Sequence, residues 1–119
     1  MKILLRLFVF VGLLILNMNA YSQDQNFYIY LCFGQSNMEG NAKFEAQDTT
    51  VDNRFQVLEA VDCPNLGRTK DHWYTDTPPL FRSHTGLTPV DYFGRTMVAN
   101  LPENIRVDVI NVSVAGCKI

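Results

Sequence analysis

The sequence lacks an excess of positive charge. Its 119 residues carry 10 basic and 12 acidic side chains. If Lys2 and Arg6 are removed with an amino-terminal signal (argued next), eight basic residues face twelve acidic ones, a net charge of −4. A nucleic-acid-binding domain normally carries a basic patch or stripe. The composition therefore argues against a nucleic-acid partner.

No hydrophobic run is long enough to cross a membrane. The longest, Leu7–Leu16, has ten residues and would span about 15 Å as a helix, half of a bilayer core of roughly 30 Å. Basic residues precede it and small residues follow it, which is the pattern of a secretory signal peptide. We predict a signal peptide over residues 1–22, cleaved before Gln23 or, alternatively, after Ala20. The protein would then be secreted or periplasmic. The other interpretation is a buried amino-terminal helix.

Cysteine is scarce, and none of the three residues, Cys32, Cys63 and Cys117, has CxxC spacing. The sequence indicates no zinc site, and we expect no metal or other cofactor. An odd count leaves at least one thiol unpaired within the chain. Export would permit a bridge between Cys63 and Cys117, which the sequence does not establish.

What is present indicates one packed α/β domain over residues 23–119. Hydrophobic residues make up 47% of the chain and charged residues 18%, which excludes a disordered chain. Residues 26–33 form an apolar, aromatic run that predicts a strand buried on both faces. Residues 54–59 alternate polar and apolar side chains, which predicts a short edge or hairpin strand. Residues 105–112 predict a second core strand. Residues 62–88 predict a long irregular stretch that is functional or covers the domain.

A helix is expected to begin near Thr88 and to end before Pro102. Thr88 can cap it, Pro89 suits its first position, and Asp91 follows at the third, where an acid is favourable. Apolar residues recur at helical spacing across this segment. A strand, a crossover that contains a helix and a second strand are typical of a parallel sheet.

The segment that suggests chemistry is Gly34–Gly40, with the sequence GQSNMEG, directly after the first strand. Loops at the carboxyl ends of parallel strands are where open α/β sheets place their sites. Gly34 permits a sharp turn, and Ser36 can present its hydroxyl to a cleft. The amide of Gln35 or Ser36 and the side chain of Asn37 could point donors at an oxyanion. The segment is not a G-x-S-x-G elbow, because glycine is absent two residues after Ser36.

The string GQSNMxG resembles the opening block of the SGNH (GDSL-like) hydrolase superfamily. More narrowly, it is similar to the SASA family of sialate O-acetylesterases and acetylxylan esterases. Further matches follow in the order and spacing of that family: Trp73, Asp76, Pro79-Leu80, Gly86–Arg95 and Val112–Ile119. The resemblance covers essentially all of residues 23–119. It implies a three-layer, flavodoxin-like α/β fold with a parallel sheet and an acetylated carbohydrate as substrate.

The resemblance also implies roles for individual residues. Ser36 matches the nucleophile, whose oxygen would attack an acetyl ester carbonyl. The amides of Ser36 and Gly86 match oxyanion donors, although Thr88 stands where the family often has a second glycine, so the donor in that loop stays open. Gln35 and Asn37 match positions that shape the turn and line the substrate site. From its residue type, Trp73 could also stack on a sugar face, and the alternative is local packing within its loop.

Two blocks of the family pattern are absent from the sequence. One is a glycine-bearing segment that supplies another oxyanion donor, and the other is the Asp-x-x-His block that supplies the base and its orienting acid. The only histidines are His72 and His84. Neither has an Asp-x-x-His context, and both are expected to be exposed loop residues, although His84 could line the cleft.

We therefore expect the chain to be the amino-terminal part of an esterase domain, truncated at its carboxyl terminus and inactive or poorly folded by itself. One alternative is an inactive secreted fragment that at most binds glycan or a partner chain. Another is an unrelated small exported protein with a chance serine motif. The sequence does not indicate an oligomeric state.

Overall fold

The computed structural model describes residues 1–4, 6 and 23–118. Four strands form one sheet in the order β1-β4-β2-β3: β1 (Phe27–Cys32), β2 (Phe55–Leu58), β3 (Trp73–Thr75) and β4 (Arg106–Asn111). β4 pairs in parallel with both β1 and β2, whereas β3 runs antiparallel to β2. An α/β fold with a mostly parallel sheet is therefore confirmed. Residues 5 and 7–22 lie outside the described residues, so the signal peptide remains a prediction. Within the described residues, no helix is long and apolar enough to span a membrane.

The two inner strands of the sheet are β4 and β2, and their apolar residues fit this position. Val107 and Val109 are fully buried and lie beside Phe55 and Val57 of β2, which are also buried. These side chains form the core with Leu80, Val90 and Val98. Burial of each large apolar side chain contributes about 1.5–3 kcal/mol, so this layer supplies much of the driving force for folding.

The prediction that β1 is buried on both faces is wrong. Ile29 is 50% exposed and Leu31 is 60% exposed. Tyr30, between them, packs against the ring of Phe93, so strand alternation places Ile29 and Leu31 on the opposite face of the sheet. β1 pairs with β4 on one side only and is an edge strand among the described residues. An apolar run shows that a strand can be covered on both faces, but it does not show that covering elements are present.

The prediction for residues 54–59 is correct in part. β2 pairs antiparallel with β3, as a hairpin strand would, but it is not an edge strand, because β4 lies on its other side. β3 was not predicted, and the stretch that contains it is firmly packed. Arg68 lies 3.6 Å from the Glu59 carboxylate and donates to the carbonyl oxygens of Thr77 and Pro79.

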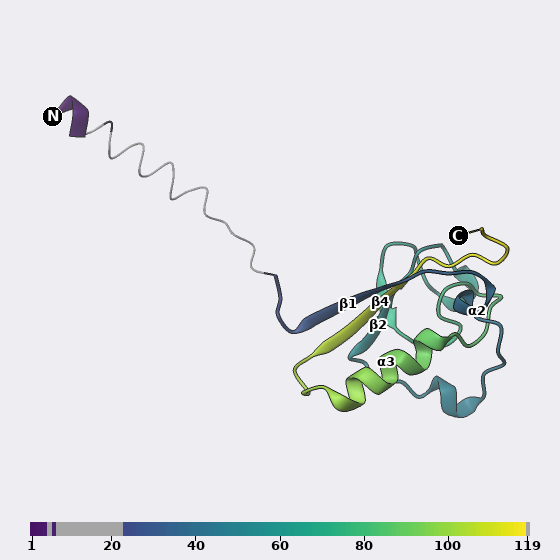
Figure 1. Cartoon of the computed structure of the whole chain (residues 1–119). Coiled ribbons are helices and arrows are strands. Elements are labelled where there is room, and N and C mark those ends of the chain that lie inside the picture. Colours follow the sequence, from purple (N-terminus) through teal and green to yellow (C-terminus); the bar gives the residue numbers. More distant parts are fainter. Residues whose placement is uncertain (5, 7–22, 119) are drawn as a thin grey trace.

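The main helix, α3 (Pro89–Asn100), begins as predicted. The Thr88 hydroxyl accepts the amide of Val90 at 3.1 Å, and the Asp91 carboxylate accepts the amide of Thr88 at 2.7 Å. This reciprocal capping satisfies donors that would otherwise be unpaired at the helix start. α3 lies along one face of the sheet (Figure 1). The shorter elements are α2 (Ser36–Glu39) and the 3₁₀ turns η1 (Ala46–Thr49) and η2 (Pro64–Leu66).

Gly94 allows α3 to approach the sheet closely. A Cβ atom at this position would lie 2.0 Å from the ring of Phe55, which is itself fully buried. Glycine is therefore required by packing, although it weakens a helix interior by about 1 kcal/mol relative to alanine.

We expect Gly94→Ala to lower the free energy of unfolding by about 2–3 kcal/mol because of overpacking. Urea unfolding followed by circular dichroism measures this, and Thr96→Ala on the exposed face of α3 is the control. Phe55→Leu should relieve the clash, so the double variant should lose less than the sum of the two single losses. Stabilisation by Gly94→Ala would mean that helix and sheet are not packed this closely.

Candidate functional site

Ser36 is the first residue of α2, and the turn that carries it follows the carboxyl end of β1. The segment after β4 lies beside it, because Val112 donates to the carbonyl of Cys32 at 3.0 Å and Val114 donates to that of Gly34 at 3.4 Å. Figure 1 shows α2 at the end of the sheet where the chain emerges from β4. The GQSNMEG segment thus occupies the predicted place, next to the carboxyl ends of two parallel strands.

Two glycines of this segment are explained by close contacts. A Cβ atom on Gly34 would lie 2.8 Å from that of Met38, so the chain can fold back tightly only with glycine there. Gly40 has a φ of 113°, and a Cβ atom on it would lie 2.5 Å from the carbonyl oxygen of Gly86. The motif is therefore a compact turn held against a second loop.

The Ser36 side chain is partly exposed, and its hydroxyl has no hydrogen-bond partner among the described residues. Its carbonyl oxygen accepts the amide of Gly40 at 3.1 Å and the Asn41 side chain at 2.8 Å. The amides of Ser36 and Asn37 lie in the first turn of α2, where amides have no acceptor within the helix. One hydroxyl and two backbone donors are thus available at the same turn.

Glu39 anchors this turn, a role that the sequence interpretation missed. Its carboxylate is nearly buried, accepts the amide of Ala115 at 2.8 Å and lies 3.3 Å from the guanidinium of Arg82. Asn111, at the end of β4, donates to the Met38 carbonyl at 2.8 Å and accepts the hydroxyl of Ser113 at 2.7 Å. These contacts join α2 to the segment after β4. The signal in the sequence was an acidic residue in a turn that is otherwise uncharged.

Gly86 lies beside the motif, but its amide is engaged. It donates to the Gly40 carbonyl at 3.0 Å, and the next amide, from Leu87, donates to Ala42 at 2.7 Å. A Cβ atom on Gly86 would lie 2.0 Å from the Ala42 carbonyl oxygen, so close backbone contact accounts for this glycine. Gly86 could act as an oxyanion donor only if its bond to Gly40 broke, and that role stays a prediction.

Residues 26–119 match the model of a family described as carbohydrate esterase, sialic acid-specific acetylesterase, known as SASA. The match covers well over half of the chain and includes the whole Ser36 turn. The chain belongs to the SASA family. The resemblance inferred from the GQSNMEG segment is therefore confirmed, and membership places the chain among carbohydrate esterases, which are hydrolases acting on esters of sugars.

Not every residue proposed for the SASA site comes together in the structure. Gln35 and Asn37 flank Ser36 and are exposed. The ring of Trp73 instead packs against the ring of Phe27, at the start of β1. The centroids of the two rings are 5.8 Å apart. The turn with Ser36 follows the other end of that strand, about 16 Å away at the usual rise per residue. The structure does not bring the Trp73 ring to Ser36.

The two histidines of this SASA chain are exposed loop residues, as predicted. His72 lies 2.9 Å from the carbonyl of Lys70 through its Nδ1 atom. His84 lines a cavity next to the Ser36 turn, between residues 40–44 and 84–86. Neither ring contacts the Ser36 hydroxyl, and within the described residues no other base does.

The cysteines do not extend the site. All three are free in the structure, with Cys63 buried and Cys117 exposed, so the Cys63–Cys117 bridge is not formed. Burial raises the pKa of the Cys32 thiol, which disfavours its reactive thiolate. In the described part of the SASA chain, no group of three or more metal-ligating side chains could hold a metal ion.

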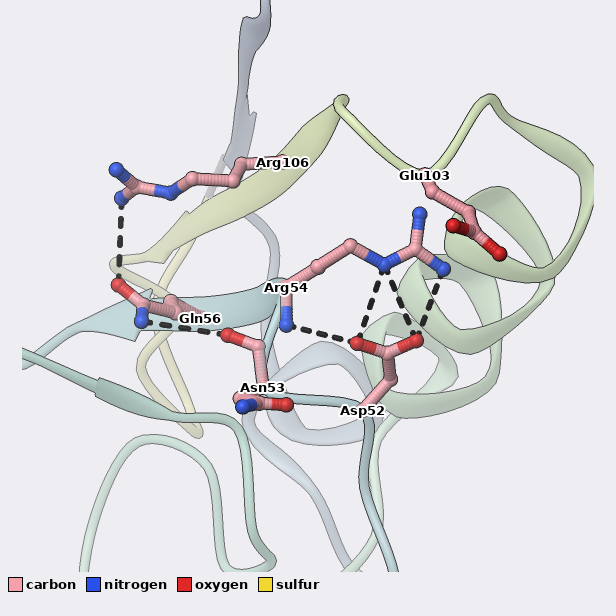
Figure 2. Close-up of a pocket in the computed structure, with 6 residues that line it drawn as sticks. All are labelled: Asp52, Asn53, Arg54, Gln56, Glu103 and Arg106. Atoms are coloured by element: carbon pink, nitrogen blue, oxygen red, sulfur yellow. Dashed lines mark hydrogen bonds and ion pairs between the residues drawn. The ribbon is translucent and has the colours of Figure 1, made fainter.

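A larger cavity, of about 650 Å³, lies at the opposite end of the sheet, where β2 and β4 begin. Figure 2 shows Arg54 held by the carboxylate of Asp52, with Glu103 and Arg106 on the other walls. Arg54 also donates to the carbonyl oxygens of Val98 and Pro102, at the end of α3. Its donors therefore serve to join the start of β2 to the helix, and they are already engaged within the chain.

Three aspartates of the SASA chain are completely buried: Asp76, Asp91 and Asp108. Burial raises the pKa of Asp91 to about 6 and that of Asp108 to about 6. Burial, reinforced by the neighbouring Asp91, raises the pKa of Asp76 well above its usual value. Neither carboxylate oxygen of Asp76 has a hydrogen-bond partner among the described residues. Since burial favours the neutral form of a carboxyl group, these three residues make the stability of the domain dependent on pH.

Proposed function

We propose that this chain provides the nucleophile of a carbohydrate O-acetylesterase and that Ser36 is that nucleophile. The observation that carries the proposal is the Ser36 hydroxyl, free of internal partners, at the carboxyl end of β1 in a chain of the SASA family. A hydroxyl that donates to no internal acceptor is available to a substrate. An exported enzyme, with residues 1–22 as its signal peptide, would meet acetylated sugars outside the cytoplasm.

In the proposed reaction the Ser36 oxygen attacks the carbonyl carbon of an acetyl ester. A bond forms between that oxygen and the acetyl carbon, and the bond to the sugar oxygen breaks, so that the sugar leaves as an alcohol after taking up a proton. Water then hydrolyses acetyl-Ser36 to acetate. The free amides of Ser36 and Asn37 are the donors we assign to the oxyanion that develops on the acetyl group.

The proton acceptor is the missing component. No imidazole or carboxylate contacts the Ser36 hydroxyl in the described residues, and a serine without a base is a weak nucleophile at neutral pH. We propose that the base belongs to residues outside those that the structure describes, as it would in a complete SGNH-type, three-layer domain. The exposed face of β1, with Ile29 and Leu31 half or more uncovered, supports a larger assembly of this kind. The competing function is glycan binding without catalysis, which the absence of a base at Ser36 favours.

Acetate release tests the proposal directly. We expect the chain alone to release acetate from O-acetylated sialic acid or acetylated xylo-oligosaccharide very slowly, and added imidazole, which supplies a base, to accelerate the release. The control is imidazole and substrate without protein. Release that never exceeds this control, with substrate binding intact, would support the non-catalytic alternative.

A further inference from the structure

The buried side chains of Asn111 and Ser113, at the end of β4 and just beyond it, contact the turn that carries Ser36. We propose that Asn111, held by Ser113, is a positioning residue that fixes the orientation of the Ser36 hydroxyl for acyl transfer. This inference rests on the proposed function, because it assigns a role in the same reaction. Both side chains are fully buried, so they would act through the Ser36 turn and not on the substrate.

The contacts of this pair lie on both sides of Ser36. Two residues after Ser36, the carbonyl oxygen of Met38 accepts a hydrogen bond from the Nδ2 atom of Asn111 at 2.8 Å. Two residues before Ser36, Gly34 lies against Ser113, since a Cβ atom on Gly34 would be 4.0 Å from the Ser113 hydroxyl oxygen. The chain at the end of β4 therefore holds the backbone on either side of the proposed nucleophile.

α2 needs contacts of this kind to keep its orientation. It has only four residues, Ser36–Glu39, and one helical turn is not stable in water by itself. The carbonyl group of Met38 lies in the last turn, where carbonyl groups have no donor within the helix, and Asn111 supplies that donor. Any rotation of α2 would move the Ser36 hydroxyl together with the amides of Ser36 and Asn37 that we assign to the oxyanion. The bond from Asn111 therefore fixes the nucleophile and its oxyanion donors at once.

The side-chain amide of Asn111 has one favourable orientation. Its Oδ1 atom accepts the backbone amide of Ser113 at 3.1 Å and the hydroxyl of Ser113 at 2.7 Å. If the group were reversed, its NH₂ group would face the Ser113 amide, which is also a donor, and its oxygen would face the Met38 carbonyl oxygen. Because the site is buried, these unmade bonds would be costly. Ser113 therefore determines that the donor of Asn111 points at α2.

Hydrogen exchange tests this inference independently of catalysis. Asn111→Leu removes the donor to α2 and the acceptor for Ser113 while it keeps a side chain of similar size. We expect the two amides that close α2, those of Glu39 and Gly40, to lose protection by about tenfold, the equivalent of one hydrogen bond. The loss stays moderate because the Glu39 carboxylate still holds the turn. Amides in the interior of β4, measured in the same NMR experiment on the full chain, should keep their protection.

The rate at which Ser36 is acetylated provides the second readout. With 4-nitrophenyl acetate and imidazole, Asn111→Leu should slow the acetylation of Ser36 by about tenfold or more, because the hydroxyl is no longer held in one orientation. Ser113→Ala removes a single donor to Asn111, and it should cause smaller losses, of about threefold, in both readouts. Gly94→Ala is the matched control: it lowers the stability of the domain through α3 and the sheet, and it should neither slow acetylation nor expose α2 selectively.

The two readouts separate positioning from a purely structural role. Faster exchange in α2 with an unchanged acetylation rate would overturn the inference, since Asn111 would then only stabilise the turn. Unchanged exchange in both variants would also overturn it, as would a loss of protection spread evenly over β4 and α3. If Ser36 of the original chain took up no acetyl group, the proposed function would fail, and the exchange data would still decide whether Asn111 holds the turn. Acetylation of Ser36 at the original rate in every variant would retain the esterase proposal and remove Asn111 from it.

Discussion

Ser36→Ala should abolish the imidazole-dependent acetate release by the protein and leave only the rate of imidazole and substrate without protein, because the hydroxyl that would accept the acetyl group is gone. The substitution removes one oxygen atom that has no partner in the described residues. It also leaves the bonds of the Ser36 carbonyl in place. The fold should therefore persist, and the loss should appear in the rate of the chemical step. Acetate measured with a coupled enzymatic assay gives the result.

Ser83→Ala is the matched control, because Ser83 is an exposed serine in a loop without contacts of its own. It should release acetate at the original rate. Circular dichroism should show equal helix content in both variants. If Ser36→Ala retained the original rate, the acetyl group would have to be accepted by another residue or directly by water.

Asp76→Asn should raise the free energy of unfolding at neutral pH more than any other single neutralisation in this chain. Asp76 is completely buried, both of its carboxylate oxygens lack partners among the described residues, and burial raises its pKa well above the usual value. The folded state therefore holds the proton more tightly than the unfolded state does. Such a group stabilises the fold below the unfolded pKa, and this stability is lost as pH rises toward the folded pKa.

Urea unfolding measured from pH 4 to pH 8 tests this prediction. The original chain should lose stability as pH rises from near 4, where an unfolded aspartate titrates, and Asp76→Asn should remove much of that loss. Asp108→Asn should show a smaller gain, of up to about 3 kcal/mol, since its pKa of about 6 differs by about two units from the unfolded value. The destabilisation by Asp108 should develop as the pH rises from about 4 to about 6. Asp71→Asn, at an exposed loop position with a φ of 64° that asparagine tolerates, is the control. A stability that does not change with pH in the original chain would contradict the account.

Local signals in the sequence were sufficient for α3. Thr88, Pro89 and Asp91 define its start through contacts within four residues, and all three occupy the expected positions. The runs that form β1 and β4 were also recognisable, because each is continuous in the sequence. The position of β2 inside the sheet was not, since it depends on pairing with β4, some fifty residues later. β3 has only three residues and is defined by its pairing with β2 instead of by its own pattern.

The same distinction applies to the site. The place of the Ser36 turn followed from a strand and a motif that are contiguous in the sequence. The anchor at Glu39 and the contact between Gly40 and Gly86 could not be predicted, because their partners are 43 to 76 residues away. For Trp73 the sequence left both sugar stacking and local packing open, and its ring packs against Phe27. Sequence patterns indicated the serine that we propose as the nucleophile, whereas the surroundings that hold it depend on long-range contacts.

The central claim is that Ser36 accepts the acetyl group, and peptide mapping by mass spectrometry tests it most directly. The chain is incubated with 4-nitrophenyl acetate and imidazole, quenched in acid and digested. We predict that the acetyl group is found on the peptide that contains Ser36 and is absent from the corresponding peptide of Ser36→Ala. An acetyl group distributed over exposed lysines and serines, with Ser36 unmodified, would contradict the account.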